Sequence, residues 1–148
     1  MKHILILVLL GSLLLASCRS APVAEEGVPA LTVTDGVASK IYTAEDLQKL
    51  VQAQAEDKGV IYLGVAIVDL LHNAGYDPDL VVIVQAIASD GFTADYDQIL
   101  FRKSDTLLAY ARLDEALSDD EGPFRMVLPG QVGKLNPRMV VELLVKHP

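Results

Sequence analysis

The pattern of hydrophobic and polar positions predicts a fold that begins with two strands and a helix. Residues 31–33 alternate as in a short strand, and the Asp-Gly pair at 35–36 is a hairpin turn signal that leads into a second strand at 37–42. Thr43 is followed by Asp46 at the third helical position, a spacing that predicts a capped helix start. One face of this helix is apolar, and we expect it to pack on a core. That face consists of Ala44, Leu47, Leu50 and Val51.

A third strand and a second amphipathic helix are predicted over residues 60–75. Residues 60–63 have the apolar character of a short strand, which we expect Gly64 to end. Apolar positions then recur at helical spacing until Gly75, a residue type that commonly ends helices in the left-handed conformation. The apolar face of this helix consists of Ile67, Leu70, Leu71 and Ala74.

Strands dominate the second half of the chain. The almost continuous apolar run at 80–88 predicts a strand buried on both faces, and the turn signal at 90–91 follows it. Periodicity alone leaves residues 106–112 open between helix and strand, and residues 113–122 form an acidic loop. Further strands are expected at 124–128 and 139–145. Because strands outnumber helices and do not alternate with them regularly, the predicted class is α+β, a single, mainly β domain.

The first residues have the features of an export signal. Lys2 and His3 give a basic start, and the apolar run at 4–15 is shorter than the roughly 20 residues that a membrane-spanning helix needs. The sequence Leu-Ala-Ser-Cys at 15–18 resembles the lipobox of bacterial lipoproteins. In such proteins the cysteine is lipidated and becomes the new N-terminus.

Lipidation of Cys18 would hold the protein at the cell envelope. Cys18 is the only cysteine of the chain, so a disulfide cannot explain it; the alternative is an ordinary signal peptide that happens to contain a cysteine. Arg19 stands where an aspartate would mark inner-membrane retention, so the resemblance implies the outer membrane, facing the periplasm, in a Gram-negative cell. We therefore expect a signal peptide at 1–17, a lipidated N-terminus with a flexible tether at 18–29 and a folded domain at 30–148.

The charge balance limits the expected partners. The chain has 20 acidic and 12 basic residues and a net charge of −8. Nucleic acid requires clustered lysines and arginines, so this balance argues against it. It also argues against peripheral binding to anionic lipid, which leaves the lipid anchor as the only expected contact with a membrane.

Several segments, taken in order, resemble the molybdopterin-binding domain of the sulfite oxidase family. They are LTVTDGV at 31–37, TAEDL at 43–47, YLGVAIVDLL at 62–71 with Ala74-Gly75, SDGF at 89–92, TLLAY at 106–110, GPFRMVLPG at 122–130, and Gly133, Lys134 and Arg138 before the last strand. The resemblance implies the fold of that domain over most of residues 31–145. It also implies that residues 106–110 are a strand, which resolves the ambiguity at 106–112.

The departures from the family pattern concern its metal centre. The family holds molybdenum by a cysteine thiolate between the first helix and the GVxL element, but residues 51–61 contain no cysteine and leave no room for the usual strand and loop. Phe92 stands where sulfite oxidases have an active-site tyrosine, and Arg138-Met139 replaces a common Lys-Trp pair. We therefore expect a non-catalytic binding protein without a bound cofactor. The alternative is a molybdopterin-dependent oxidoreductase with atypical cofactor ligation.

Three cations are the candidate binding residues. Arg125 lies in an otherwise apolar strand, and Lys134 and Arg138 lie in the segment that resembles the family's phosphate-contacting loop. Together with Asp90 and Phe92 they form a candidate anion- or cofactor-binding site at the rim of the family's cofactor cleft. A small anionic ligand or an envelope protein is the expected partner. The competing interpretation is that each cation pairs with a carboxylate of the acidic loop.

Other motifs give no catalytic or metal site. His72 and His147 are the only histidines after the signal segment, whereas a metal site needs several converging ligands. The acidic residues at 114–121 lack the spacing of an EF-hand loop, and no serine lies in a nucleophile-elbow motif. Residues 130–134 lack the spacing of a Walker motif. We expect no catalytic residue and no metal ligand.

Overall fold

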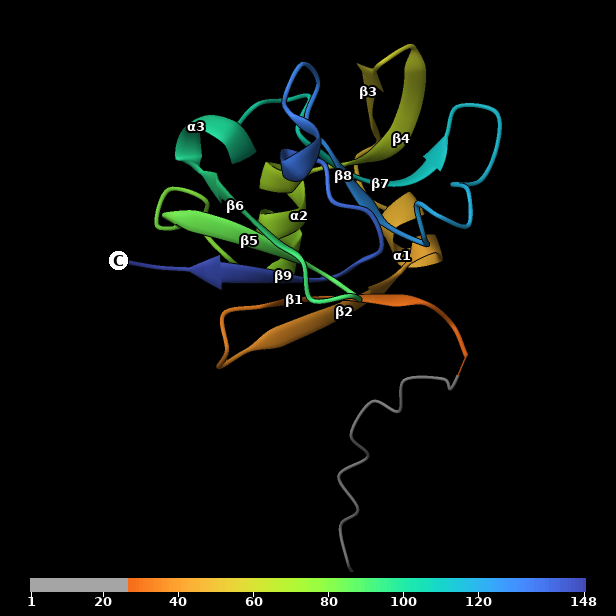
Figure 1. Cartoon of the computed structure of the whole chain (residues 1–148). Coiled ribbons are helices and arrows are strands. Elements are labelled where there is room, and N and C mark those ends of the chain that lie inside the picture. The colour runs from red at the N-terminus through yellow and green to blue at the C-terminus, as the bar shows by residue number, and fades with distance from the viewer. Residues whose placement is uncertain (1–26) are drawn as a thin grey trace, which may run out of the picture.

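The computed structural model describes residues 27–148 (Figure 1). In chain order its elements are β1 (Ala30–Thr34), β2 (Ser39–Thr43), α1 (Ala44–Gln48), β3 (Ala53–Asp57), β4 (Val60–Ala66), α2 (Ile67–Ala74), β5 (Ile83–Ala88), β6 (Thr93–Asp97), α3 (Gln98–Phe101), β7 (Leu107–Arg112), β8 (Arg125–Val127), the 3₁₀ helix η1 (Gly133–Leu135) and β9 (Val140–Lys146). The predicted signal peptide and the lipidation site at Cys18 lie outside the described residues. Within residues 27–148, every helix is too short or too polar to cross a membrane.

The strands form two sheets. One has five strands in the order β2-β1-β9-β5-β6, and the other has four in the order β3-β4-β7-β8. The first and last strands, β1 and β9, pair in parallel, whereas the other paired strands are antiparallel. Helix α2 lies between the two sheets (Figure 1). The prediction of a single, mainly β domain of the α+β class is confirmed.

The main core surrounds α2. Ile67, Leu70 and Leu71 of this helix are fully buried, and they share one apolar cluster with Leu143 of the five-stranded sheet and Leu108 of the four-stranded sheet. Burial of each such side chain contributes about 1.5–3 kcal/mol. The helix therefore holds the two sheets together. A smaller cluster lies on the four-stranded sheet and consists of Ala55, Tyr62, Ala66, Leu107, Ala109 and Val127.

Local sequence signals set the ends of the first two helices. The backbone N–H of Asp46 donates to the Thr43 hydroxyl at 3.2 Å, and the Asp46 carboxylate accepts from the Thr43 N–H at 3.1 Å, so the capping box is confirmed. Gly75 ends α2 with a φ of 93°, as predicted. Helix α1 is shorter than its predicted apolar face, since Leu47 is buried but Val51 lies beyond the helix and is exposed.

Residues 51–61 do contain a strand, so the prediction that they leave no room for one is wrong. Strand β3 pairs with β4 in a hairpin, with Ala53 opposite Gly64. Gly64 lies inside β4 and does not end it, which corrects a second expectation. A Cβ atom on Gly64 would lie 2.2 Å from the carbonyl oxygen of Leu108, so the glycine allows β7 to approach closely at a bulge. The hydrophobic pattern missed β3 because its apolar positions are only alanines.

The strand within the predicted run at 80–88 is half exposed. It begins at Ile83, and its residues alternate between buried positions such as Val84 and partly exposed ones such as Gln85. The prediction of burial on both faces is wrong, because within the described residues α2 covers only one face of the five-stranded sheet (Figure 1).

The remaining strands agree with the sequence analysis in most places. The strand implied at 106–110 is confirmed as β7, which continues to Arg112, and the strands expected at 124–128 and 139–145 are β8 and β9. Strand β6 and helix α3 were not predicted. Ala94 and Tyr96 alternate with polar residues in β6, which is the signal that could have identified this edge strand.

Candidate functional site

Arg125 lies at the centre of a buried polar network. Its Nη1 atom is 2.6 Å from Oε1 of Glu121 and 2.9 Å from the hydroxyl of Tyr62, which donates to the same carboxylate oxygen at 2.9 Å. The guanidinium also lies 4.7 Å from the centroid of the Tyr62 ring. The side chains of Arg125 and Glu121 are only 7% and 3% exposed, so this arginine is not open to a ligand.

Glu121 connects this network to the acidic loop at residues 113–122. Its Oε2 atom accepts from Nε of Arg112 at 3.1 Å and from the backbone N–H of Ser118 at 3.0 Å. Burial by itself raises the pKa of Glu121, but the hydrogen bonds from Ser118, Arg125 and Tyr62 outweigh it and lower the pKa to about 2. The carboxylate is therefore ionised, and it fastens the acidic loop to the four-stranded sheet.

The other two candidate cations lie on the surface. Arg138 forms an ion pair with Asp120 of the acidic loop, and both side chains are more than half exposed. Lys134 is exposed in η1. For Arg125 and Arg138 the structure thus has the pairing with acidic-loop carboxylates that the sequence left as the competing interpretation.

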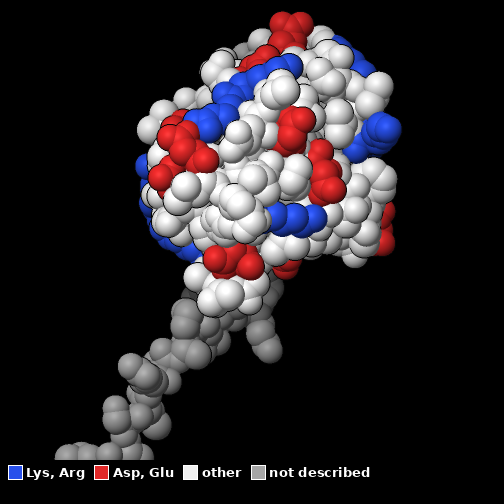
Figure 2. All heavy atoms as spheres, turned by 90° about the vertical axis from the view of Figure 1, so that its left-hand side faces the viewer, with Lys and Arg blue, Asp and Glu red and all other residues white. Residues whose placement is uncertain are grey.

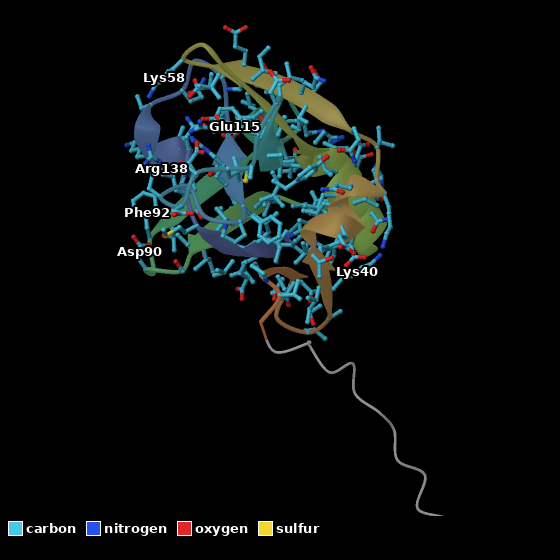
Figure 3. All side chains as sticks on the ribbon, turned by 90° about the vertical axis from the view of Figure 1, so that its right-hand side faces the viewer. Lys40, Lys58, Asp90, Phe92, Glu115 and Arg138 are labelled. Carbon is cyan, nitrogen blue, oxygen red and sulfur yellow. The ribbon has the colours of Figure 1, made fainter. Side chains whose placement is uncertain are left out.

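The turn containing Asp90 and Phe92 lies close to Arg138 (Figure 3). The backbone N–H of Ser89 donates to the carbonyl oxygen of Met139 at 2.9 Å, which joins this turn to the start of β9. The Phe92 side chain is 44% exposed. The fold therefore brings Arg138 close to the turn, whereas Arg125 is buried in a separate network. The assignment of these residues to an anion site stays a prediction.

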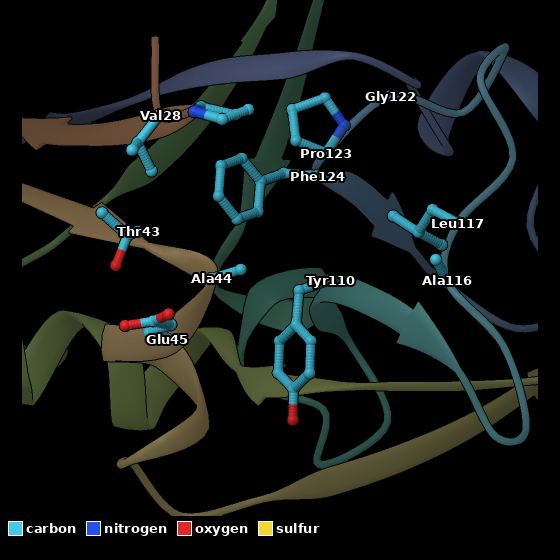
Figure 4. Close-up of a pocket in the computed structure, with 11 residues that line it drawn as sticks. Val28, Thr43, Ala44, Glu45, Tyr110, Ala116, Leu117, Gly122, Pro123 and Phe124 are labelled. Atoms are coloured by element: carbon cyan, nitrogen blue, oxygen red, sulfur yellow. The ribbon is translucent and has the colours of Figure 1, made fainter. Parts of the chain in front are cut away.

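A pocket of about 440 Å³ opens between α1, β7 and the end of the acidic loop (Figure 4). The rings of Tyr110 and Phe124 and the side chains of Val28 and Leu117 line it, and Glu45 lies on one side. Sequence analysis did not single out any of these residues as a site. They come from segments far apart in the chain, so the tertiary fold brings them together. Several of them belong to segments that resemble the family, but that resemblance does not indicate a pocket.

The residues present do not fit the molybdenum cofactor that the resemblance implies. Cys18 is the only cysteine of the chain, and the segment that would supply the thiolate forms β3 and a turn without any sulfur ligand. Phe92 offers no hydroxyl beside the turn. Arg125 and Arg138, which would suit a pterin phosphate, already pair with Glu121 and Asp120. The described residues therefore supply no thiolate for the metal, and both of these arginines are already paired.

The histidines lie apart from each other. His72 is exposed on α2, and His147 near the chain end places Nε2 4.0 Å from Asp35. Among residues 27–148, no three His, Cys, Asp or Glu side chains converge as metal ligands. Acidic and basic side chains are interspersed over the face shown in Figure 2, and that face has no extended basic area.

Comparisons with known proteins agree with this architecture. The sulfane dehydrogenase SoxCD from Paracoccus pantotrophus has a similar structure, with a TM-score of 0.67 and 22% sequence identity over 79% of this chain and 38% of that chain. The chain thus spans less than half of the SoxCD chain it matches, and the likeness shows a shared fold. No curated protein matches the sequence. The family described as the oxidoreductase molybdopterin binding domain matches residues 39–147, which is most of the chain, and this protein therefore belongs to that family.

Proposed function

We propose that this chain is a cell-envelope lipoprotein whose molybdopterin-type domain serves as a non-catalytic binding protein. The observation that carries the proposal is the set of donor groups at the family's cofactor cleft. Molybdenum in this family is expected to need a soft thiolate, and the chain's single cysteine lies at position 18, far before the segment that would provide it. A domain that keeps the family's fold but lacks the thiolate that would hold the metal is suited to binding and not to metal-based redox chemistry.

The arginines support the same conclusion. A phosphate-bearing cofactor is best held by guanidinium groups that are free to form bidentate hydrogen bonds. Arg125 is instead committed to Glu121 and Tyr62, and Arg138 to Asp120. These pairs stabilise the acidic loop, which is a structural role that a binding protein can keep after the cofactor is lost.

The proposed location rests on the N-terminal sequence. The short apolar run and the lipobox-like residues before Cys18 fit lipidation after export. An acidic domain gains little from anionic lipid surfaces, so the acyl chains would provide the attachment. In a Gram-negative cell this places the domain in the periplasm, on the outer membrane.

Elemental analysis tests whether the chain lacks the molybdenum that redox chemistry would need. The full chain is produced in a bacterial host that makes molybdopterin, next to a cysteine-bearing member of the family as the positive control. We expect the control to carry molybdenum in near-equimolar amount and this chain to carry none above background. We also expect its absorption spectrum to have no pterin band, and sulfite oxidation to be at the level of the buffer.

A near-equimolar molybdenum content in this chain would overturn the proposal. It would favour the alternative, a molybdopterin-dependent oxidoreductase whose metal is held without a cysteine. The positive control makes the result interpretable, because it shows that the host delivered the cofactor.

A further inference from the structure

We propose that the pocket between α1, β7 and the acidic loop binds a small apolar molecule that carries an amine cation. This inference rests on the proposed function, which assigns a binding role to the domain, and it adds the class of ligand that the domain binds. The pocket is the one of about 440 Å³ shown in Figure 4, a volume in the range of small-molecule sites.

The lining of the pocket selects an apolar ligand body. Val28, Ala44 and Leu117 present hydrocarbon groups, and the ring of Phe124, which is already fully buried, forms part of the wall. In the view of Figure 4 the rings of Phe124 and Tyr110 lie between Glu45 on the left and Leu117 on the right. A ligand with an aromatic or branched apolar body would remove this surface from water, which is the main favourable term in such binding.

The two hydroxyl groups that line the pocket already have partners. The Thr43 hydroxyl takes part in the capping box of α1 with Asp46. The Tyr110 hydroxyl donates to the side-chain carbonyl of Gln52. Neither group therefore demands a polar ligand atom, and an apolar body leaves no hydrogen bond unmade.

Charge complementarity selects a cation. Among residues 27–148, Glu45 is the only charged residue that lines the pocket, and it is exposed at its edge. No lysine or arginine of this described part lines the pocket, so an anionic ligand would meet a carboxylate and an acidic protein of net charge −8 without compensation from them. An amine, in contrast, would approach the Glu45 carboxylate, and the half-buried Tyr110 ring that lines the pocket offers a further attraction for a cation.

The test compares three probes with the same apolar body. They are 4-phenylbutylamine, 4-phenylbutan-1-ol and 4-phenylbutanoate, which are cationic, neutral and anionic at pH 7. Each is titrated into the ¹⁵N-labelled chain lacking the signal peptide and carrying Ser in place of Cys18, and amide chemical shifts are recorded. We expect the amine to bind most tightly, with a dissociation constant of about 1 mM given its size, and the carboxylate to bind most weakly. The shifted amides should be those of Tyr110, Leu117 and Phe124.

Two variants locate the charge effect. Glu45→Gln should weaken amine binding about two- to fivefold and leave the alcohol unchanged, as expected for one exposed ion pair. Glu56→Gln is the matched control, because Glu56 is an exposed carboxylate on β3 outside the pocket, and it should leave all three affinities unchanged.

A third variant tests whether binding takes place in this pocket. Ala116→Trp fills the pocket from an exposed position and should abolish binding of the amine and the alcohol.

Equal affinities for the three probes, or shifts confined to another part of the domain, would overturn the inference. The same holds if Ala116→Trp binds the amine as well as the wild type does. These outcomes are separate from the molybdenum measurement. If the protein is free of molybdenum but does not bind the amine, only the proposed ligand class is refuted. If the protein carries stoichiometric molybdenum, the proposed non-catalytic function is refuted.

Discussion

The Arg125 guanidinium and the Glu121 carboxylate form a buried ion pair with a contact of 2.6 Å. Arg125 belongs to β8 and Glu121 to the acidic loop, so the pair joins a core strand to a surface segment. The Tyr62 hydroxyl of β4 donates a hydrogen bond to Glu121 and accepts one from Arg125. Such a pair adds little net stability over an apolar replacement, but it is costly to break on one side, because a charge then remains buried without compensation.

Replacing Arg125 by leucine should therefore destabilise the domain strongly. We expect the free energy of unfolding to fall by about 3 kcal/mol in Arg125→Leu, the lower end for a broken buried pair, because Glu121 keeps its buried charge but also keeps its contact with Arg112. The double variant Arg125→Leu, Glu121→Leu should recover part of this loss. Urea denaturation followed by circular dichroism measures both values.

The control for this prediction is the exposed pair of Arg102 and Asp79, whose side chains are 40% and 73% exposed. Arg102→Leu should change the free energy of unfolding by no more than about 1 kcal/mol. If Arg125→Leu is as mild as Arg102→Leu, the pair is not buried as described.

Acid should destabilise the domain through Glu121. Burial raises the pKa of this carboxyl, but hydrogen bonds lower it from the ordinary 4.5 to about 2. The folded state thus holds the proton less readily than the unfolded state, and the stabilisation is complete above pH 4.5 and is lost as the pH falls toward 2. The free energy of unfolding should therefore decrease as the pH is lowered between these two values.

In Glu121→Gln the same series should have a shallower slope, because the titrating group is gone. Glu56→Gln, at an exposed position, should keep the slope of the wild type. Parallel curves for all three proteins would show that other carboxyl groups cause the acid sensitivity.

Adding a methyl group at Gly64 should disturb the four-stranded sheet. The new Cβ atom in Gly64→Ala would lie 2.2 Å from the Leu108 carbonyl oxygen, so β4 and β7 would have to move apart. We expect a loss of about 1–3 kcal/mol in the free energy of unfolding, typical of overpacking. Gly133→Ala is the matched control, since nothing lies within 4 Å of the added atom, and it should be close to neutral. A neutral Gly64→Ala would contradict the close strand contact.

The lipid anchor is tested at Cys18. Cys18→Ala should no longer incorporate labelled palmitate and should leave the membrane fraction, either as an uncleaved precursor or as a soluble exported form. Ser17→Ala, which keeps a small residue next to the cysteine, should still be labelled. Undiminished lipid labelling and membrane partitioning of Cys18→Ala would refute the anchor.

The sequence by itself determined the structural elements that depend only on residues close together in the chain. The Thr43–Asp46 capping box, the Gly75 helix end and the apolar face of α2 depend on neighbouring residues, and each was predicted correctly. The absence of a thiolate in the metal-binding segment is also a property of the sequence, and no fold can supply the missing sulfur.

Only the tertiary structure decided which residues meet across the chain. Strand β3 was missed because two small alanines carry its pattern, and it becomes a strand through pairing with β4. Glu121 looked like one more acid of a solvated loop, but Tyr62, 59 positions earlier, and Arg125 draw it into the interior. The pocket around Tyr110 likewise exists only where separate segments converge, because long-range contacts are set by packing and not by local sequence.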